Sequence, residues 1–227
     1  MTAAAGRATT VPLALFALLT AVHLAALLVD ATTAVHLTKP ALMPVLAVWA
    51  LARGGPWPLP AALLCGCGGD VLLQIGGETA FLAGMGCFAA GHLCYLTLFA
   101  RAGRRRTRPW AAAGYGAAWL GTVALLWPGL APHLRLPVAG YSLLLTVMAL
   151  AALGAGVWSG LGGALFMLSD TLIAAGLADW PRPPVPQFWI MATYMAAQWL
   201  LTAGATRDGP APRAGTGARQ PMTPVRP

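Results

Sequence analysis

Two aspartates lie inside long apolar stretches of this sequence, one hundred positions apart and in similar local phrases. Asp70 lies in Gly-Asp-Val-Leu-Leu (residues 69–73) and Asp170 in Ser-Asp-Thr-Leu-Ile (residues 169–173), and a glycine follows each phrase three residues later. A carboxylate at the centre of a membrane helix costs about 2.5–3.5 kcal/mol on insertion scales, so its presence there points to a function. The pair predicts either acid–base chemistry in a buried site or a pathway for ions.

The apolar stretches themselves predict a polytopic membrane protein. Of the 227 residues, 58% are hydrophobic and 9% are charged, and the mean hydropathy is +0.70. A membrane-spanning helix needs about 17–25 mainly apolar residues. We therefore predict an all-α domain, residues 1–204, with about eight transmembrane helices at 11–29, 35–52, 57–75, 79–100, 109–127, 137–153, 160–178 and 185–204. Residues 205–227, rich in Pro, Gly and Arg, are predicted to be a disordered cytoplasmic tail.

The net charge of +8 could indicate a nucleic-acid partner, but the distribution of basic residues argues against one. With eight spans and a cytoplasmic N-terminus, Lys39, Arg135 and Arg182 lie outside, and the other eleven of the 14 basic residues lie inside. This is the positive-inside bias of membrane proteins. We expect an integral protein of a bacterial-type plasma membrane with both termini in the cytoplasm, in contact with membrane lipids and not with nucleic acid. The first apolar stretch is long for a signal peptide, so we expect it to be retained.

The two aspartate phrases fall on the third and seventh predicted helices, which run in the same direction. The helix after each carries a further similarity, Phe-Ala-Ala-Gly-His at residues 88–92 and Tyr-Met-Ala-Ala-Gln at residues 194–198. One interpretation is a 4+4 parallel repeat. Chance similarity between apolar sequences is the other, because the remaining helices match poorly.

Depth in the membrane relates further polar residues to the aspartates. A helix rises 1.5 Å per residue, which puts Asp70 about 8 Å and Asp170 about 12 Å from the outer face. The second and sixth helices start at that face, so Lys39 and Tyr141 lie at a similar depth. We therefore predict an outer-half polar pocket that contains Lys39, Asp70, Tyr141, Ser169 and Asp170.

Structural interpretations of these residues also stand. Lys39 could pair with Asp70 as an ion bridge or extend to the interface. His92, Tyr95 and Gln198, which lie deeper, could be hydrogen-bonding residues between helices. His23, near the end of its predicted helix, carries little signal. The four cysteines lie in predicted helices without the spacing of a zinc site, so no metal site is indicated.

In these residues the sequence resembles the YhhN family of membrane lysoplasmalogenases. The similar elements cover about residues 36–200, whereas the fifth predicted helix and both ends carry almost none. They are Thr38-Lys39-Pro40, Met43-Pro44, Gly69-Asp70-Val71-Leu72-Leu73, Phe81-x-x-Gly84, Phe88, His92-x-x-Tyr95, Gly-Ala-Leu-Phe-Met-Leu-Ser-Asp at 163–170, and Tyr194-x-x-Ala197-Gln198.

The resemblance implies an eight-helix enzyme that hydrolyses the vinyl ether bond of lysoplasmalogens. The substrate would be a lysophospholipid, and the products a fatty aldehyde and a glycerophospho-ethanolamine or -choline. No metal or organic cofactor is expected. The family pattern marks Lys39, Asp70, His92, Tyr95, Ser169 and Asp170, and we add Tyr141 and Gln198 as supporting residues.

Vinyl ether hydrolysis begins with protonation of the β-carbon, and water then captures the resulting oxocarbenium ion. This needs a carboxylic acid that is neutral near pH 7 and a second, ionised carboxylate that stabilises the cation and orients water. Glycosidases use a carboxylate pair in the same way. We predict Asp170 as the acid, because no cation adjoins it in sequence, and Asp70, kept charged by Lys39, as its partner. The reverse assignment stays open, and Lys39 could instead contact the substrate phosphate.

Two other functions also use buried aspartates. A proton-coupled transporter would carry protons through them, and the repeat and the line from Asp70 toward His92 favour that alternative. An intramembrane aspartyl protease of the presenilin type needs Tyr-Asp followed by Gly-x-Gly-Asp, an order that residues 67–70 and 169–170 do not reproduce.

Overall fold

The computed structural model describes residues 2–101 and 107–207, and within them the chain is all-helical. Part of the predicted basic loop (residues 102–106) and most of the predicted tail (208–227) lie outside the described residues. The all-α fold is confirmed. The eight helices are α1 (Thr2–Leu28), α2 (Thr32–Ala52), α3 (Pro58–Ile75), α4 (Glu78–Arg101), α5 (Pro109–Leu126), α6 (Pro132–Ala155), α7 (Val157–Leu177) and α8 (Pro186–Arg207).

Local sequence explains where several helices begin and end. Four of them start at a proline, at Pro58, Pro109, Pro132 and Pro186. Proline suits the first turn because the amide at that position would have no partner within the helix. α3 ends at Ile75, and the following Gly76 has a φ of +77°, in the left-handed region that glycine adopts without steric cost.

Six helices, α1 to α4, α6 and α7, are long and apolar enough to cross a membrane. α5 falls short because glycines and a tyrosine dilute its apolar residues. α8 carries polar residues such as Gln198 and packs against α1, α2, α3, α6 and α7, so much of its surface faces protein and not lipid. The six apolar helices indicate an integral membrane protein.

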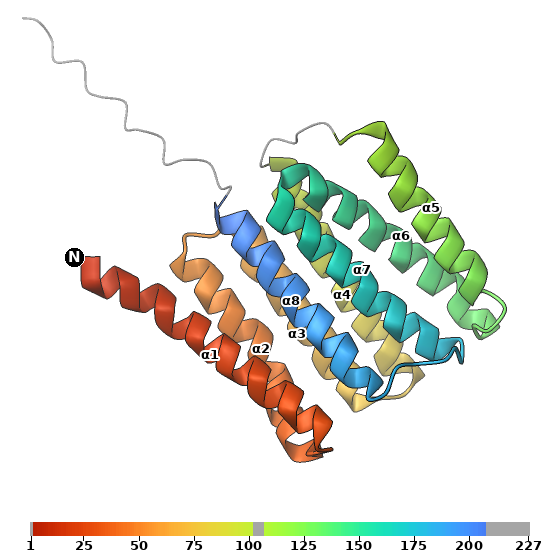
Figure 1. The fold of residues 1–227 in the computed structure, drawn as a ribbon, viewed down its shortest axis with the longest axis horizontal. Coiled ribbons are helices and arrows are strands. Elements are labelled where there is room, and N and C mark those ends of the chain that lie inside the picture. The colour runs from red at the N-terminus through yellow and green to blue at the C-terminus, as the bar shows by residue number, and fades with distance from the viewer. Residues whose placement is uncertain (1, 102–106, 208–227) are drawn as a thin grey trace, which may run out of the picture.

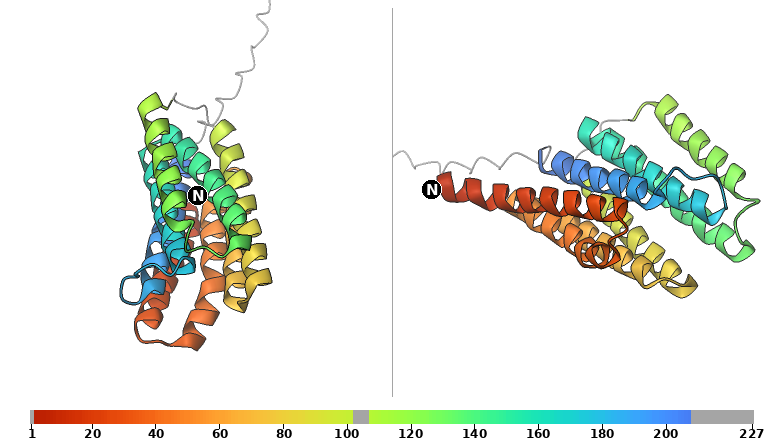
Figure 2. Two further views of the ribbon diagram at one scale, coloured as in Figure 1. Left: turned by 90° about the vertical axis from the view of Figure 1, so that its right-hand side faces the viewer. Right: turned by 60° about the horizontal axis from the view of Figure 1, so that its bottom comes forward.

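Seven helices form a closed ring, and α5 lies outside it. Around the ring the order is α1, α2, α3, α4, α6, α7 and α8, and α8 packs back against α1. α5 packs chiefly against α6 at the edge of the molecule opposite α1 (Figure 1). The second view in Figure 2 shows a flattened ring, with α1, α8 and α7 in one layer and α2, α3 and α4 in the other.

Glycines allow close approach of helices on the α6–α7–α8 side. A β-carbon on Gly163 of α7 would lie 2.8 Å from Cα of Ala149 in α6. On Gly162, it would lie 2.8 Å from the backbone nitrogen of Leu201 in α8. Small residues at interfaces provide such close packing in membranes, where dispersion contacts hold helices together.

The predicted spans overlap the helices one to one, with shifted ends. The largest differences are α1, which begins at Thr2, and α6, which extends from Pro132 to Ala155. Arg135 and Pro137 interrupt the apolar pattern of α6 but lie in its first two turns, where neither breaks the helix. The two-fold repeat stays a prediction: α1 helps to close the ring, whereas its counterpart α5 lies outside.

Candidate active site

A cavity of about 310 Å³ lies at the end of the ring that carries the α3–α4 and α7–α8 connections. Both aspartates line it, Asp70 from α3 and Asp170 from α7, together with Lys39 of α2 and Ser169 of α7. Tyr141, the fifth residue of the predicted pocket, contacts Asp170 from α6. The structure thus brings together the polar residues that were predicted to share a pocket because they lie at similar depth in the membrane.

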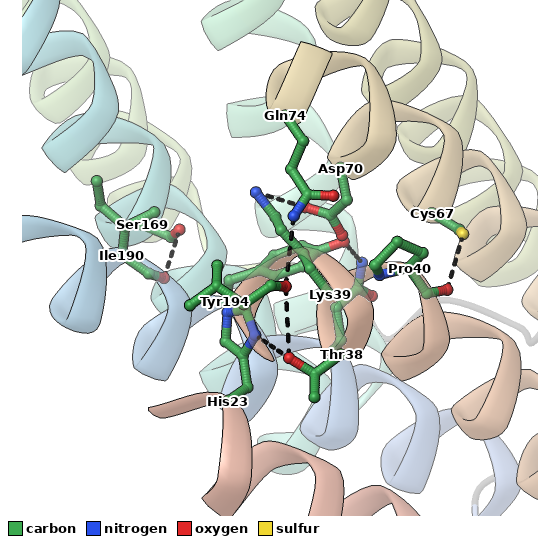
Figure 3. A network of polar contacts seen from close by, with 12 residues as sticks. His23, Thr38, Lys39, Pro40, Cys67, Asp70, Gln74, Ser169, Ile190 and Tyr194 are labelled. Atoms are coloured by element: carbon green, nitrogen blue, oxygen red, sulfur yellow. Dashed lines mark hydrogen bonds and ion pairs between the residues drawn. The ribbon is translucent and has the colours of Figure 1, made fainter. Parts of the chain in front are cut away.

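Asp70 and Lys39 form an ion pair on the cavity wall. Nζ of Lys39 lies 3.6 Å from Oδ1 of Asp70. Asp70 is only 3% exposed. The second oxygen, Oδ2, is buried without a hydrogen-bond partner among the described residues. Figure 3 shows Lys39 reaching from α2 toward Asp70, with Tyr194 of α8 nearby. Oδ1 is therefore paired with Lys39, whereas Oδ2 is enclosed by the protein.

Two prolines determine how α2 meets α3 near Lys39. Pro40 and Pro44 lie inside α2, and Pro44 has no amide hydrogen to donate to the carbonyl of Pro40 four residues earlier. The thiol of Cys67 on α3 donates to this carbonyl instead, with Sγ 3.3 Å from the oxygen. Because Cys67 lies one turn before Asp70, the bond holds Lys39 and Asp70 at the same level.

Asp170 ends a hydrogen-bonded chain that crosses three helices. The hydroxyl of Tyr141 on α6 donates to Oδ2 of Asp170, and Nε2 of His92 on α4 lies 3.1 Å from the same hydroxyl. His92 is buried and packs edge-on against Phe166, with ring centroids 4.8 Å apart. A hydroxyl donates and accepts at the same time, so Tyr141 couples the carboxyl of Asp170 to the imidazole of His92.

A second chain connects Tyr95 of α4 to the Asp70 side of the cavity. The hydroxyl of Tyr95 donates to Oε1 of Gln198 at 2.6 Å, and Nε2 of Gln198 donates to the hydroxyl of Tyr194 at 3.2 Å. All three side chains are buried, and Tyr194 lines the cavity with Asp70. His92 and Tyr95 therefore begin two separate chains one helical turn apart.

Aromatic rings form the wall behind the two aspartates. Phe88, Phe166 and Tyr194 meet edge to face, with centroids 5.4–6.5 Å apart. Gly69, the residue before Asp70, makes room for this wall, since a β-carbon there would lie 2.5 Å from Cε2 of Phe88. The small residue in the first aspartate phrase thus has a packing reason.

Two narrow apolar pockets adjoin Asp170. One, of about 60 Å³, lies between α5, α6 and α7, and the other, of about 50 Å³, lies between α3, α4, α6 and α7. Both are lined by Asp170 and Tyr141 and by apolar side chains such as Val138 and Ala174. Asp170 therefore lies at a boundary between a polar cavity and apolar pockets.

The sequence model of the YhhN family matches residues 34–205 of this chain. The chain belongs to the YhhN family. Lysoplasmalogenase TMEM86B of Rattus norvegicus is 38% identical over 172 residues, which are 75% of this chain and 71% of that protein. The human protein of the same name is 34% identical over 179 residues, 73% of this chain and 71% of its own length. Lysoplasmalogenase of Mycobacterium tuberculosis is 34% identical over 165 residues, 68% of this chain and 62% of that protein. No solved structure matches the chain.

The YhhN match includes every residue of the site described above. The helix α1, which precedes the match, adds a buried histidine. His23 is 0% exposed, and its Nδ1 lies 2.8 Å from the hydroxyl of Thr38, the neighbour of Lys39. Thr38 donates its own hydrogen to the carbonyl of Ala34, so Nδ1 of His23 is the donor to Thr38. His23 was expected to carry little signal because it lies near the end of its predicted helix. Its burial depends on which face of α1 packs against α2, which hydropathy alone does not tell.

Two further residues at the YhhN cavity differ from expectation. The hydroxyl of Ser169 donates to the carbonyl of Ile190 at 3.0 Å, so this predicted site residue also joins α7 to α8. Arg182, counted in the sequence only as an outer-side charge, lines the cavity from the α7–α8 connection. Its position a few residues after the helix that carries Asp170 could have indicated that Arg182 lies near the site.

Within the part of this YhhN protein that the structure describes, His, Cys, Asp and Glu side chains form no group of three that could hold a metal ion. The four cysteines are free thiols.

Proposed function

We propose that this protein is a lysoplasmalogenase, a membrane enzyme that hydrolyses the vinyl ether bond of a lysophospholipid. The observation that carries the proposal is the placement of Asp70, Asp170 and Lys39 on one cavity, with apolar pockets beside Asp170. Relatives that bear this name, 34–38% identical to the chain, support it. The products would be a fatty aldehyde and a glycerophospho base.

The reaction begins when the carboxyl group of Asp170 transfers its proton to the β-carbon of the vinyl ether. The double-bond electrons form the new C–H bond, and the positive charge is left on the α-carbon and ether oxygen as an oxocarbenium ion. Water adds to the α-carbon and gives a proton to the carboxylate of Asp70. Asp70 then gives this proton to the glycerol oxygen as the hemiacetal breaks its bond to that oxygen. The hemiacetal hydroxyl loses its own proton to the carboxylate of Asp170 as the aldehyde forms, which restores both aspartates.

The surroundings of the two aspartates support this division of roles. Lys39 pairs with Asp70 at 3.6 Å, whereas no ion pair engages Asp170 among the described residues. Asp70 lines the cavity beside this ion pair, where its carboxylate can take a proton from water. Tyr141 donates to Asp170 and would stabilise the carboxylate that proton transfer leaves behind. A positioned proton donor contributes about 10²–10⁴-fold to a rate.

A lysophospholipid has a polar headgroup and an apolar chain, and this site likewise has a polar cavity and apolar pockets. The glycerophospho headgroup fits the polar cavity, and the alkenyl chain fits against the apolar pockets beside Asp170, which places the ether bond between them. The pockets, about 60 and 50 Å³, hold only the first part of a long chain. The rest of the chain would continue into the bilayer.

We also propose the orientation in the membrane. The cavity end carries Lys39, Arg135 and Arg182. The opposite end carries basic residues such as Arg53, Arg101, Arg108 and Arg207. The positive-inside rule then places the cavity toward the outer face of a bacterial-type plasma membrane and both termini in the cytoplasm.

The test is aldehyde release by the purified full-length protein in detergent from 1-alkenyl-glycerophosphoethanolamine. Asp70→Asn and Asp170→Asn should each lower the rate about 100-fold or more. Asp30→Asn is the matched control, because Asp30 is an exposed aspartate of the α1–α2 connection with a φ of +54° that asparagine also tolerates.

Absence of aldehyde from folded wild-type protein would overturn the proposed function. Wild-type rates in both cavity variants would retain the hydrolase but overturn the roles assigned to the carboxylates.

A further inference from the structure

Arg182 is a cation on the cavity wall that the proposed reaction does not use. It is exposed in the α7–α8 connection and lines the cavity. Its guanidinium lies over Gly176 in the last turns of α7, since a β-carbon on that glycine would lie 3.4 Å from Nη1 and 3.5 Å from Cδ of Arg182. Gly176 closes the second aspartate phrase, so Arg182 packs over the end of that phrase.

The other two cations at this end of the molecule are already engaged. Lys39 pairs with Asp70. Nε of Arg135 donates to the carbonyl of Leu130 at 3.0 Å, and its guanidinium lies 5.8 Å from the ring centroid of Trp127. Among the described residues, no ion pair or hydrogen bond engages the guanidinium of Arg182. It remains available to an anion in the cavity.

The beginning of α8 adds to the positive potential beside Arg182. Pro186 and Gln187, the first residues of α8, line the cavity. Pro186 has no amide hydrogen, and Phe188 donates its amide to the carbonyl of Val185. The amide of Gln187 and the dipole of α8 therefore supply the positive potential, which favours anions. The planar guanidinium can donate two parallel hydrogen bonds to two oxygens of one phosphate.

We propose that Arg182, with Gln187 and the first turn of α8, binds the phosphodiester group of the lysophospholipid headgroup. This inference rests on the proposed function. Gly176, beneath the guanidinium, lies six residues after Asp170, about 9 Å along α7. Six bonds separate the phosphorus of a lysoplasmalogen from the reacting α-carbon, about 7 Å in an extended chain. A phosphate at Arg182 therefore brings the vinyl ether to Asp170.

The experiment measures binding without turnover, so that it does not depend on catalysis. The probes are two saturated ethers that cannot be hydrolysed at a double bond, octyl-glycerophosphoethanolamine and octylglycerol, titrated into full-length protein by calorimetry. Arg182→Ala should raise Kd for the phosphate probe about 10-fold or more and leave Kd for octylglycerol unchanged. Arg182→Lys should fall between, because it keeps the charge but not the two-pronged donor.

Two pairs of variants control for structural effects. Arg53→Ala removes an exposed arginine at the opposite end of the molecule and should leave both affinities unchanged. In Gly176→Ala, the new β-carbon would touch Arg182 only at ordinary contact distance, so both affinities should equal those of the wild type. In Gly176→Leu, the larger side chain should displace the guanidinium and weaken binding of the phosphate probe as Arg182→Ala does.

An unchanged affinity for the phosphate probe in Arg182→Ala would overturn the inference. An equal loss for both probes would also overturn it, since it would indicate a structural role. Inorganic phosphate, added as a competitor, distinguishes the source of the anion: displacement of the probe at low millimolar phosphate would assign the site to free phosphate instead of a lipid headgroup. Aldehyde release, measured separately, tests the proposed function, so failure of one is distinguishable from failure of the other.

Discussion

At the residue scale, the two aspartates share a phrase in the sequence but not an environment in the fold. Asp70 faces the ammonium group of Lys39, whereas Asp170 accepts a hydrogen bond from Tyr141, itself connected to His92. An ammonium group favours a charged carboxylate at all times. A hydroxyl can serve a carboxyl group that changes its protonation during a reaction, because it donates or accepts. This asymmetry fits one acid and one charged partner.

Tyr141→Phe should slow aldehyde release about 10- to 100-fold without unfolding the protein. The change removes one hydroxyl and its hydrogen bond to a charged group, which contributes about 1.5–3 kcal/mol. The measurement is the rate with saturating 1-alkenyl-glycerophosphoethanolamine. Tyr115→Phe, in α5 away from the cavity, is the control. A wild-type rate for Tyr141→Phe would show that the His92–Tyr141 connection is not used.

Gln198→Leu and Tyr95→Phe should each destabilise the protein by about 1–3 kcal/mol, because each leaves a buried polar partner unpaired. The double variant should lose less than the sum of the two, since the residues share one hydrogen bond. Unfolding in detergent, followed by tryptophan fluorescence, provides the measurement. Strict additivity would contradict a coupled pair.

Sequence reasoning reached some side chains and not others for a physical reason. Lys39 and Asp70 could be related because depth along two neighbouring helices follows from counting residues. Arg182 and His23 could not, because one lies in a connection without periodicity and the other depends on how α1 is rotated. Polar residues are found by their cost in an apolar stretch, but their partners depend on the packing of helices distant in sequence.

At the scale of elements, α3 approaches α8 through a small residue beside the site. A β-carbon on Gly66 would lie 2.8 Å from the hydroxyl of Tyr194 and 3.2 Å from Nε2 of Gln198. The glycine thus lets the chain from Tyr95 to Tyr194 pass between the helices.

Gly66→Ala should therefore destabilise the protein by about 1–3 kcal/mol through overpacking and lower activity. Gly86→Ala is the matched control: nothing lies within 4 Å of a β-carbon there among the described residues. The stability of the Gly86→Ala control should rise by about 0.5–1 kcal/mol, because alanine has a higher helix propensity than glycine. Thermal unfolding of both variants in detergent checks the difference in sign, and equal stability of the two would contradict the packing argument.

The number of helices was predictable because length and hydropathy determine it locally. Their arrangement was not, because nothing in α4, α5 or α6 alone indicates that α4 pairs with α6 and leaves α5 outside. The extension of α6 across Arg135 and Pro137 also escaped prediction, since charge and proline are tolerated near a helix end.

At the scale of the whole molecule, the proposed orientation predicts the accessibility of the connections. Trp180→Cys, in the α7–α8 connection, should react with a membrane-impermeant maleimide on intact cells, because that connection borders the cavity. Arg53→Cys, in the α2–α3 connection, should react only after the membrane is opened. Both positions are exposed in the structure. The opposite pattern would invert the protein in the membrane.

The boundary at Asp170 has a consequence for what happens after cleavage. The proposed reaction would cut one amphiphile into two molecules with opposite solubility, at the point where the polar cavity meets the apolar pockets. The glycerophospho base would then contact only the polar cavity, and the aldehyde only the apolar pockets. Each fragment then diffuses into the phase that dissolves it, so their re-encounter at the site is rare, and dilution into two phases drives hydrolysis forward.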